Sequence, residues 1–198
     1  MISFNNISEE TPYQILKIKY DEALKANQKN IEAIAISSYS NESKEVNSRF
    51  VNLKFVNDNE FIFFSNYDSP KSREFMSHSQ ITALIYWSSI DFQIRIKANI
   101  KKTSKEFNKN YFEMRDKHKN ALAISSEQSN KILSYDDVIK RHNDVLNSKD
   151  LYKCPSYWGG FTFKPYYFEF WKGHKSRLNR RDAYEKNKKV WNHFVLQP

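Results

Sequence analysis

Glycine, proline and cysteine are scarce in this chain of 198 residues, which contains 3, 5 and 1 of them, respectively. So little glycine and proline excludes collagen-like and low-complexity classes. The single Cys154 cannot form an internal disulfide, and with 5 dispersed histidines it fits no zinc motif, so we expect a reducing cytoplasm and no metal. No apolar run approaches the ~18–20 residues of a membrane span, and the opening MISFNNISEE lacks the pattern of a signal peptide.

Aromatic residues and positive charge are, by contrast, abundant. Phe, Tyr and Trp make up 16% of the chain, which argues against disorder. The length suits a single domain over 1–198, in which we expect the polar residues 1–11 to be loose. The net charge of +9 suits nucleic acid, an anionic membrane surface or small phosphorylated ligands, although surplus lysine is also common on solvated faces.

Periodicity predicts a mainly β protein with flanking helices (α+β). We expect strands at 31–39, 46–55, 61–65, 81–87, 92–100, 158–171 and 184–195, and helices at 12–24, from 69–70 onward, at 104–118 and at 134–147. The segment 92–100 alternates strictly between apolar and polar residues, which is typical of a half-buried strand. Short connections favour an antiparallel sheet, and many strands with few long helices favour closure into a small barrel.

Arg49 and Lys54 place two cations on one expected strand. Cations inside a barrel require an anion or solvent, and arginine suits bidentate contact with phosphate while lysine acts as a point charge. Period two puts these residues on opposite faces, so one ligand would contact both only if the strand bulges. An edge strand with solvated charges is the alternative interpretation.

Two helical segments offer further anion-binding groups. Lys71 follows Ser69-Pro70 in the first turn of an expected helix, where free N–H groups attract anions and an unpaired cation is otherwise unfavourable. Tyr111 and Arg115 share a helical face at i, i+4, and Lys119 would continue it, so together they could bind a phosphate. An ordinary capped helix and a surface helix with a packed tyrosine are the alternatives.

The C-terminal region carries the most specific pattern. Gly159 and Gly160 are adjacent, so this point needs either a positive φ or a close approach of the backbone. The run PSYWGGF at 155–161, followed by EFW at 169–171 and RLNRR at 177–181, resembles the signature of the pyridoxamine-5′-phosphate oxidases, which are FMN-dependent flavoenzymes. The resemblance covers roughly residues 12–198.

The resemblance implies a fold, a cofactor and a reaction. The fold is an FMN-binding split β-barrel in a homodimer with FMN at its interface, and neither nucleic acid nor a membrane is an expected partner. The reaction is the oxidation of pyridoxamine or pyridoxine 5′-phosphate to pyridoxal 5′-phosphate. In that reaction a hydride passes from C4′ to N5 of FMN, and O2 then reoxidises the flavin and yields H2O2.

The resemblance also implies a role for individual residues. The expected FMN contacts are Arg49, Phe50, Val51, Asn52, Leu53, Lys54, Phe64, Ser65, Lys71, Gln93, Gln128, Ser129, Trp171 and Arg181. The expected substrate contacts are Lys54, Tyr111, Arg115, Lys119, Arg177 and Asn179. Of these, Arg177 would lie over the pyridine ring, and Arg177 with Asn179 would form the catalytic pair.

Several departures from the family pattern concern the substrate. Pro70 replaces an arginine, Lys119 replaces a serine, and Asn179 with Arg180 replaces a His-Asp pair. An N-terminal segment that covers the substrate in the family has no counterpart here. Two alternatives therefore stay open: a family member that oxidises another substrate, of the phenazine-pathway type, and a non-catalytic basic binding module.

Overall fold

The computed structural model describes residues 1–147 and 150–198 of the chain. The strands are β1 (Ser3–Asn5), β2 (Ala33–Ser40), β3 (Glu45–Asn52), β4 (Phe55–Asn57), β5 (Glu60–Asn66), β6 (Gln80–Trp87), β7 (Phe92–Lys102), β8 (Trp158–Lys172), β9 (Arg180–Asn187) and β10 (Val190–Leu196). The helices are α1 (Thr11–Lys25), α2 (Pro70–Ser77), α3 (Lys105–Glu113), α4 (Lys117–Ser125) and α5 (Tyr135–Leu146), with a short 3-10 helix at Ser88–Ile90.

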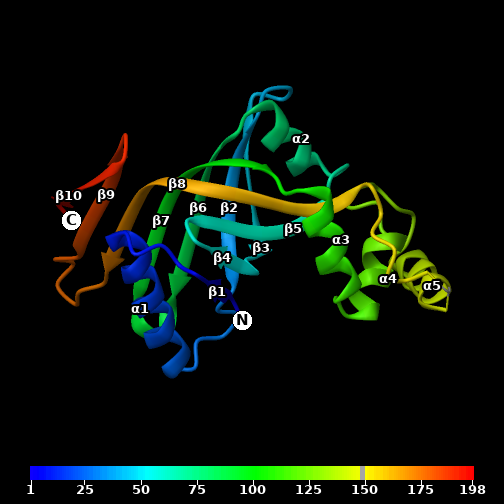
Figure 1. The fold of residues 1–198 in the computed structure, drawn as a ribbon, viewed down its shortest axis with the longest axis horizontal. Coiled ribbons are helices and arrows are strands. Elements are labelled where there is room, and N and C mark those ends of the chain that lie inside the picture. Colours follow the sequence, from blue (N-terminus) through cyan, green and yellow to red (C-terminus); the bar gives the residue numbers. More distant parts are fainter. Residues whose placement is uncertain (148–149) are drawn as a thin grey trace.

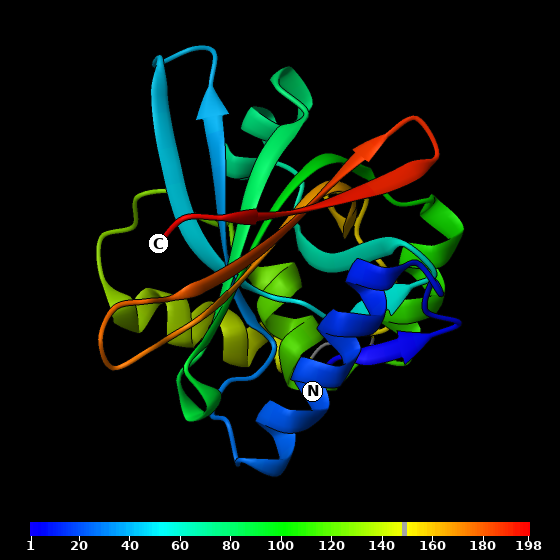
Figure 2. The same cartoon turned by 90° about the vertical axis from the view of Figure 1, so that its left-hand side faces the viewer.

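All the strands belong to one sheet, in the order β1-β4-β5-β8-β7-β6-β2-β3, and β9 pairs with both β8 and β10. Every pairing is antiparallel except that of β1 with β4. The helices α3, α4 and α5 lie at one end of the longest axis, and the β9–β10 hairpin lies at the other (Figure 1). Seen from that second end, the hairpin crosses in front of the sheet (Figure 2). The prediction of a mainly β protein with flanking helices is confirmed.

The core consists largely of aromatic and β-branched side chains. Along β7 the buried residues alternate with half-buried ones, as the period-two pattern predicted. Phe61 stacks on Phe163 with the ring centroids 5.1 Å apart, and both rings are fully buried. Each such ring stabilises the fold by about 1.5–3 kcal/mol. Helix α1 covers one edge of this core through the buried Tyr13 and Leu16, which follow the predicted helical spacing.

Four expected elements differ from the structure. The expected strand 184–195 is the hairpin of β9 and β10, because the chain turns at residues 188 and 189, where Lys188 has a φ of 55°. Residues 3–5 are not loose: they form β1, because Ile2 is buried and the strand pairs with β4. The expected strand 46–55 is interrupted between Asn52 and Phe55, where Leu53 enters the core. The expected helix 104–118 is two helices, because the Asp116 side chain accepts hydrogen bonds from the backbone N–H groups of residues 118 and 119 and starts α4.

The adjacent glycines of β8 are explained by a close approach. No glycine in the described residues has a positive φ. A Cβ at Gly159 would lie 2.2 Å from Tyr67 Oη, and one at Gly160 would lie 2.6 Å from Thr103 Oγ1. The two glycines therefore leave room for the side chains of Tyr67 and Thr103, which pack directly against the backbone of β8. Within the parts of the chain that the structure covers, none of the helices is long and apolar enough to cross a membrane.

Candidate functional site

A cavity of about 590 Å³ brings together residues from distant parts of the sequence. We call it the anion pocket. Its lining residues are Arg49, Phe50, Val51, Asn52, Lys54, Phe64, Ser65, Lys71, Tyr111, Met114, Arg115, Asp116, Lys119, Gln128 and Ser129. All but Met114 and Asp116 are contacts that the sequence predicted. Leu53, which the sequence also predicted, is fully buried in the core and is absent from this lining.

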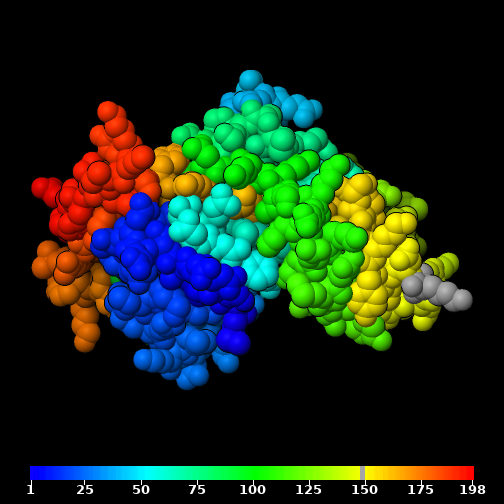
Figure 3. Space-filling view, in the orientation of Figure 1, coloured from blue at the N-terminus to red at the C-terminus, as the bar shows by residue number. Residues whose placement is uncertain are grey.

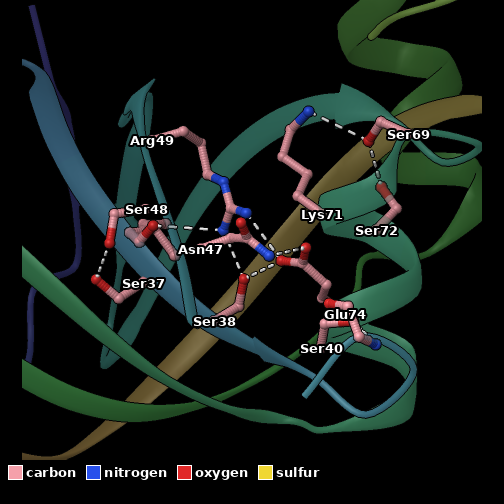
Figure 4. Close-up of polar contacts among 12 residues, drawn as sticks. Ser37, Ser38, Ser40, Asn47, Ser48, Arg49, Ser69, Lys71, Ser72 and Glu74 are labelled. Carbon is pink, nitrogen blue, oxygen red and sulfur yellow. Dashed lines mark hydrogen bonds and ion pairs between the residues drawn. The ribbon is translucent and has the colours of Figure 1, made fainter. Parts of the chain in front are cut away.

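Arg49 is held on one side by a buried carboxylate. Its Nη2 lies 2.8 Å from Glu74 Oε2 in α2, and its Nη1 donates to Ser38 Oγ in β2 (Figure 4). Glu74 is 7% exposed and also accepts a hydrogen bond from Asn47 Nδ2 at 3.0 Å. Arg49 thus reaches the pocket with its guanidinium already oriented by hydrogen bonds.

Lys71 is the most deeply buried cation of the pocket, at 9% exposure. Its Nζ is 3.2 Å from Ser69 Oγ, and within the described residues no carboxylate lies within ion-pair distance of it (Figure 4). Burial, together with the charge of Arg49, lowers the pKa of Lys71 to about 8. A buried lysine without a counter-ion is costly, so an anion bound at this point would relieve the cost.

Lys54 lines the same pocket as Arg49, although the sequence placed the two on opposite faces of one strand. The strand ends at Asn52, and Lys54 lies in the two-residue link before β4. The face rule for a regular strand therefore does not apply to it. Burial lowers the pKa of Lys54, and the charges of Lys119 and Arg115 lower it further against the opposing effect of Glu32.

The expected stripe of Tyr111, Arg115 and Lys119 is assembled across two helices rather than along one. Tyr111 lies in α3, Arg115 in the turn that follows, and Lys119 in the first turn of α4. The Tyr111 ring stacks on Phe64 at 4.0 Å between centroids, and the Arg115 guanidinium lies 4.8 Å from the Trp158 ring. All three residues still line the anion pocket.

A polar bridge connects the end of β5 with the segment after α4. Gln128 Oε1 accepts hydrogen bonds from Ser65 Oγ at 3.1 Å and from the Asn66 backbone N–H at 3.3 Å. Ser129 has a φ of 72°, a left-handed conformation that is uncommon for residues other than glycine. This bridge brings the predicted Gln-Ser pair to the wall of the pocket.

Three more predicted FMN contacts lie side by side on the sheet, outside the anion pocket. Gln93 of β7 is paired with Trp171 of β8, which is paired with Arg181 of β9. Beside them the carboxylate of Glu169, 3% exposed, pairs with Arg181 at 2.9 Å and with Arg95 on its other side. Burial alone would raise the pKa of Glu169, but hydrogen bonds from both arginines lower it.

The predicted catalytic pair lies in the loop between β8 and β9. Arg177 has a φ of 61°, and its backbone N–H donates to the His174 carbonyl at 2.9 Å. Asn179 Oδ1 accepts a hydrogen bond from the His174 backbone N–H at 3.0 Å, so its side chain also shapes the loop. We call Gln93, Glu169, Trp171, Arg181 and this loop (173–179) the C-terminal cluster.

The structure does not bring the two groups of predicted residues together within one chain. None of Gln93, Trp171, Arg177, Asn179 and Arg181 lines the anion pocket. The strand β9 and the adjoining end of β8, which carry most of the C-terminal cluster, lie at one end of the molecule. The helices α3–α5 beside the pocket lie at the other end (Figures 1 and 3). Within a single chain the predicted contacts therefore form two separate groups.

The sequence did not predict that two buried glutamates, Glu74 and Glu169, contact the arginines assigned to the site. Glu74 contacts an arginine 25 positions away in the sequence, and Glu169 contacts one that is 74 positions away. No local spacing indicates such pairs. Glu169 does lie in the EFW motif that carries the resemblance, which was the one available signal.

Comparisons with known proteins fit this geometry. Residues 158–198 match the family model described as the pyridoxine 5′-phosphate oxidase C-terminal dimerisation region. The chain is 34% identical over 180 residues to a pyridoxine/pyridoxamine 5′-phosphate oxidase from Hydrogenovibrio crunogenus, covering 89% of this chain and 83% of that one. It is 35% identical over 194 residues to a protein of the same name from Colwellia psychrerythraea, covering 96% of this chain and 88% of that one.

Solved structures share the fold. PhzG from Burkholderia lata 383, in complex with tetrahydrophenazine-1-carboxylic acid, superposes with a TM-score of 0.89 at 24% identity, over 94% of this chain and 92% of that one. A pyridoxamine 5′-phosphate oxidase-related, FMN-binding protein from Nostoc punctiforme superposes with a TM-score of 0.75 at 11% identity, over 91% of this chain and 96% of that one. At these identities the likeness is one of fold.

Proposed function

The chain belongs to the pyridoxine/pyridoxamine 5′-phosphate oxidase family, and on this premise we propose that it oxidises pyridoxine or pyridoxamine 5′-phosphate to pyridoxal 5′-phosphate with FMN and O2. The observation that carries the proposal is the charge of the anion pocket. Five cations line it, and within the described residues only Arg49 forms an ion pair with a carboxylate. The pocket thus offers more positive charge than the protein itself neutralises.

The residues at one side of the pocket fit FMN. Arg49 and Lys71 supply positive charge, and Ser65, Gln128 and Ser129 supply neutral hydrogen-bonding groups. The unpaired, buried Lys71 is the group that a phosphate would complete. When bound, FMN supplies the acceptor for the substrate hydride and passes the electrons to O2, which yields H2O2.

The residues at the other side fit the phosphate of the substrate. Lys54, Arg115 and Lys119 are close enough for the latter two to lower the pKa of Lys54, and Tyr111 adds a phenol hydroxyl. Such a group of cations binds a dianionic phosphate and so fixes the position of the ring attached to it. Lys119, in place of the family serine, adds a charge where the family has a neutral hydroxyl.

We propose that the C-terminal cluster of a second copy completes each site. The match of 158–198 to a dimerisation region supports a homodimer, and the separation of the two partial sites within one chain requires a partner if both act together. In this arrangement Arg177 and Asn179 reach the substrate, while Gln93, Trp171 and Arg181 contact FMN. The whole chain acts as one domain of the split-barrel type.

Anaerobic reduction of the flavin tests the proposed function. The protein is loaded with FMN, pyridoxine 5′-phosphate is added without O2, and the visible flavin absorption is followed. We expect bleaching that reverses when air is admitted, with pyridoxal 5′-phosphate as the product. A bound flavin that stays oxidised with both pyridoxine and pyridoxamine 5′-phosphate would contradict the assigned substrate. Failure to bind FMN would contradict the cofactor assignment.

A further inference from the structure

We infer that Glu74 is a positioning residue, which holds the guanidinium of Arg49 in the orientation that receives FMN. The inference rests on the proposed function, in which Arg49 contacts FMN. It goes further because Glu74 is absent from the lining of the anion pocket, so its effect on a ligand would pass through Arg49. Glu74 acts through its hydrogen bonds alone.

Both carboxylate oxygens of Glu74 accept hydrogen bonds. Oε2 accepts hydrogen bonds from Arg49 Nη2 at 2.8 Å and from Ser38 Oγ. Oε1 accepts a hydrogen bond from Asn47 Nδ2 at 3.0 Å. Ser38 in turn accepts from Arg49 Nη1, so the carboxylate, the hydroxyl and the guanidinium form a closed cycle (Figure 4). A side chain held at two nitrogens by such a cycle has few alternative rotamers.

The fold places Glu74 one helical turn after Lys71. The two residues, three positions apart in α2, therefore lie close together on the same side of the helix. Figure 4 shows Glu74 turned toward Arg49 and the β2–β3 strands, while the Lys71 side chain extends toward Ser69. Within the described residues, Arg49 Nε has no hydrogen-bond partner, so the guanidinium keeps donors for a ligand after Glu74 has bound it.

Two effects of Glu74 on FMN binding oppose each other. As a negative charge beside an anion site, it repels the FMN phosphate, so its removal would tighten binding. As the group that holds Arg49, it spares the arginine the loss of rotamer freedom on binding, so its removal would weaken binding. We assign the larger effect to positioning, because Arg49 already offsets the charge of Glu74 in an ion pair.

The substitution Glu74→Gln separates the two effects by sign. FMN affinity is measured by quenching of flavin fluorescence on titration with the cofactor-free protein. We expect Glu74→Gln to weaken FMN binding about tenfold, which is the usual effect of losing a hydrogen bond between charged groups. The control is Glu45→Gln, which removes the same charge from an exposed position on β3, the strand that carries Arg49, and should change the affinity less than about twofold.

A double-mutant cycle tests whether Glu74 acts through Arg49. In the Arg49→Ala background, Glu74→Gln should weaken FMN binding by less than about twofold, because the group that it positions is gone. Equal losses in both backgrounds, or tighter binding by Glu74→Gln alone, would overturn the inference. If Glu74→Gln fails to fold, Ser38→Ala breaks the same cycle without a charge change and should weaken binding about threefold; unchanged binding would overturn the inference. Wild-type protein that binds no FMN would instead refute the proposed function.

Discussion

Beside the anion pocket, Glu74 pairs with one arginine and two neutral donors, whereas in the C-terminal cluster Glu169 lies between two arginines. Both carboxylates are nearly inaccessible to solvent. They differ in what surrounds them. Near Glu74, the cation Lys71 has no carboxylate partner among the residues that the structure describes, while near Glu169 both cations share one.

This difference shows how each region uses its charge. The C-terminal cluster uses its buried charges largely to join β7, β8 and β9, so its electrostatics stabilise the fold. Among the residues that the structure describes, four of the five cations of the anion pocket have no carboxylate partner, so a bound anion would offset charges that are costly in the unliganded protein. Substitutions in the two regions should therefore change stability and binding in opposite ways.

The largest effect should follow from Glu169→Gln. Loss of the buried charge leaves two half-buried arginines without a counter-ion, which lowers the free energy of unfolding by about 3 kcal/mol. Because the folded protein lowers the pKa of Glu169 below its usual 4.5, the contribution of this group exists above about pH 4.5 and is lost as the pH falls.

Urea unfolding at pH 7 and at pH 4 measures both predictions, and Glu169→Gln should show the flatter pH dependence. The matched control is Glu185→Gln, on an exposed position of the neighbouring strand β9. A loss at Glu169 no larger than the loss at Glu185 would contradict the structural role of this carboxylate.

Lys71→Met should produce the opposite combination in the pocket. FMN affinity should fall about 30-fold, since a charge-assisted contact with phosphate is lost. The cofactor-free protein should become more stable, because an unpaired buried cation is removed. Flavin titration measures the affinity, and thermal unfolding without FMN measures the stability. The substitution Lys189→Met, at an exposed position, is the control. A lower melting temperature for the cofactor-free Lys71→Met protein would count against this view of the pocket.

Arg177→Ala should separate turnover from cofactor binding. Because Arg177 is assigned to the substrate, kcat should fall about twentyfold as an orienting contact is lost, while the protein keeps its FMN and its yellow colour. Steady-state kinetics and flavin content after gel filtration give the two values. Release of flavin by Arg177→Ala, with normal turnover after reconstitution, would show that the division of roles is wrong.

The smallest predicted effect is a dependence of FMN affinity on pH. The pKa of Lys71 is about 8 in the protein without ligand, so above pH 8 the lysine must take up a proton before it can pair with phosphate. Affinity should therefore fall about fivefold between pH 8 and pH 9. Lys71→Arg should remove this dependence, since arginine stays charged. An equal slope in both proteins would exclude Lys71 as its origin.

Local patterns predicted those parts of the molecule that local forces determine. The alternation at 92–100 gave β7 correctly, and Ser69-Pro70 marked the start of α2. The break at Leu53 and the start of α4 at Asp116 were missed, because a single buried side chain and a single cap decide them. Interruptions of this kind depend on the tertiary environment, which periodicity does not report.

The resemblance to a family predicted the residues of the anion pocket better than it predicted their environment. Thirteen expected contacts line the pocket, because matched motifs transfer residue identities reliably. The partners that hold those residues, such as Ser38 and Glu74 around Arg49, come from other strands and helices and leave no trace in the motif. The motif also gives no sign of the hydrogen bond that Asn179 Oδ1 accepts from the His174 backbone N–H, because this bond exists only in the folded loop.

A hybrid dimer tests most directly whether two copies share each site. Lys71→Met and Arg181→Ala proteins, each of low activity and each carrying a different tag, are unfolded together, refolded with FMN and assayed with pyridoxine 5′-phosphate. Half of the dimers should be hybrids with one intact site each, so we predict recovery of about a quarter of the wild-type activity. Hybrids that form, as shown by co-purification of both tags, yet stay no more active than the parent proteins would contradict the shared site.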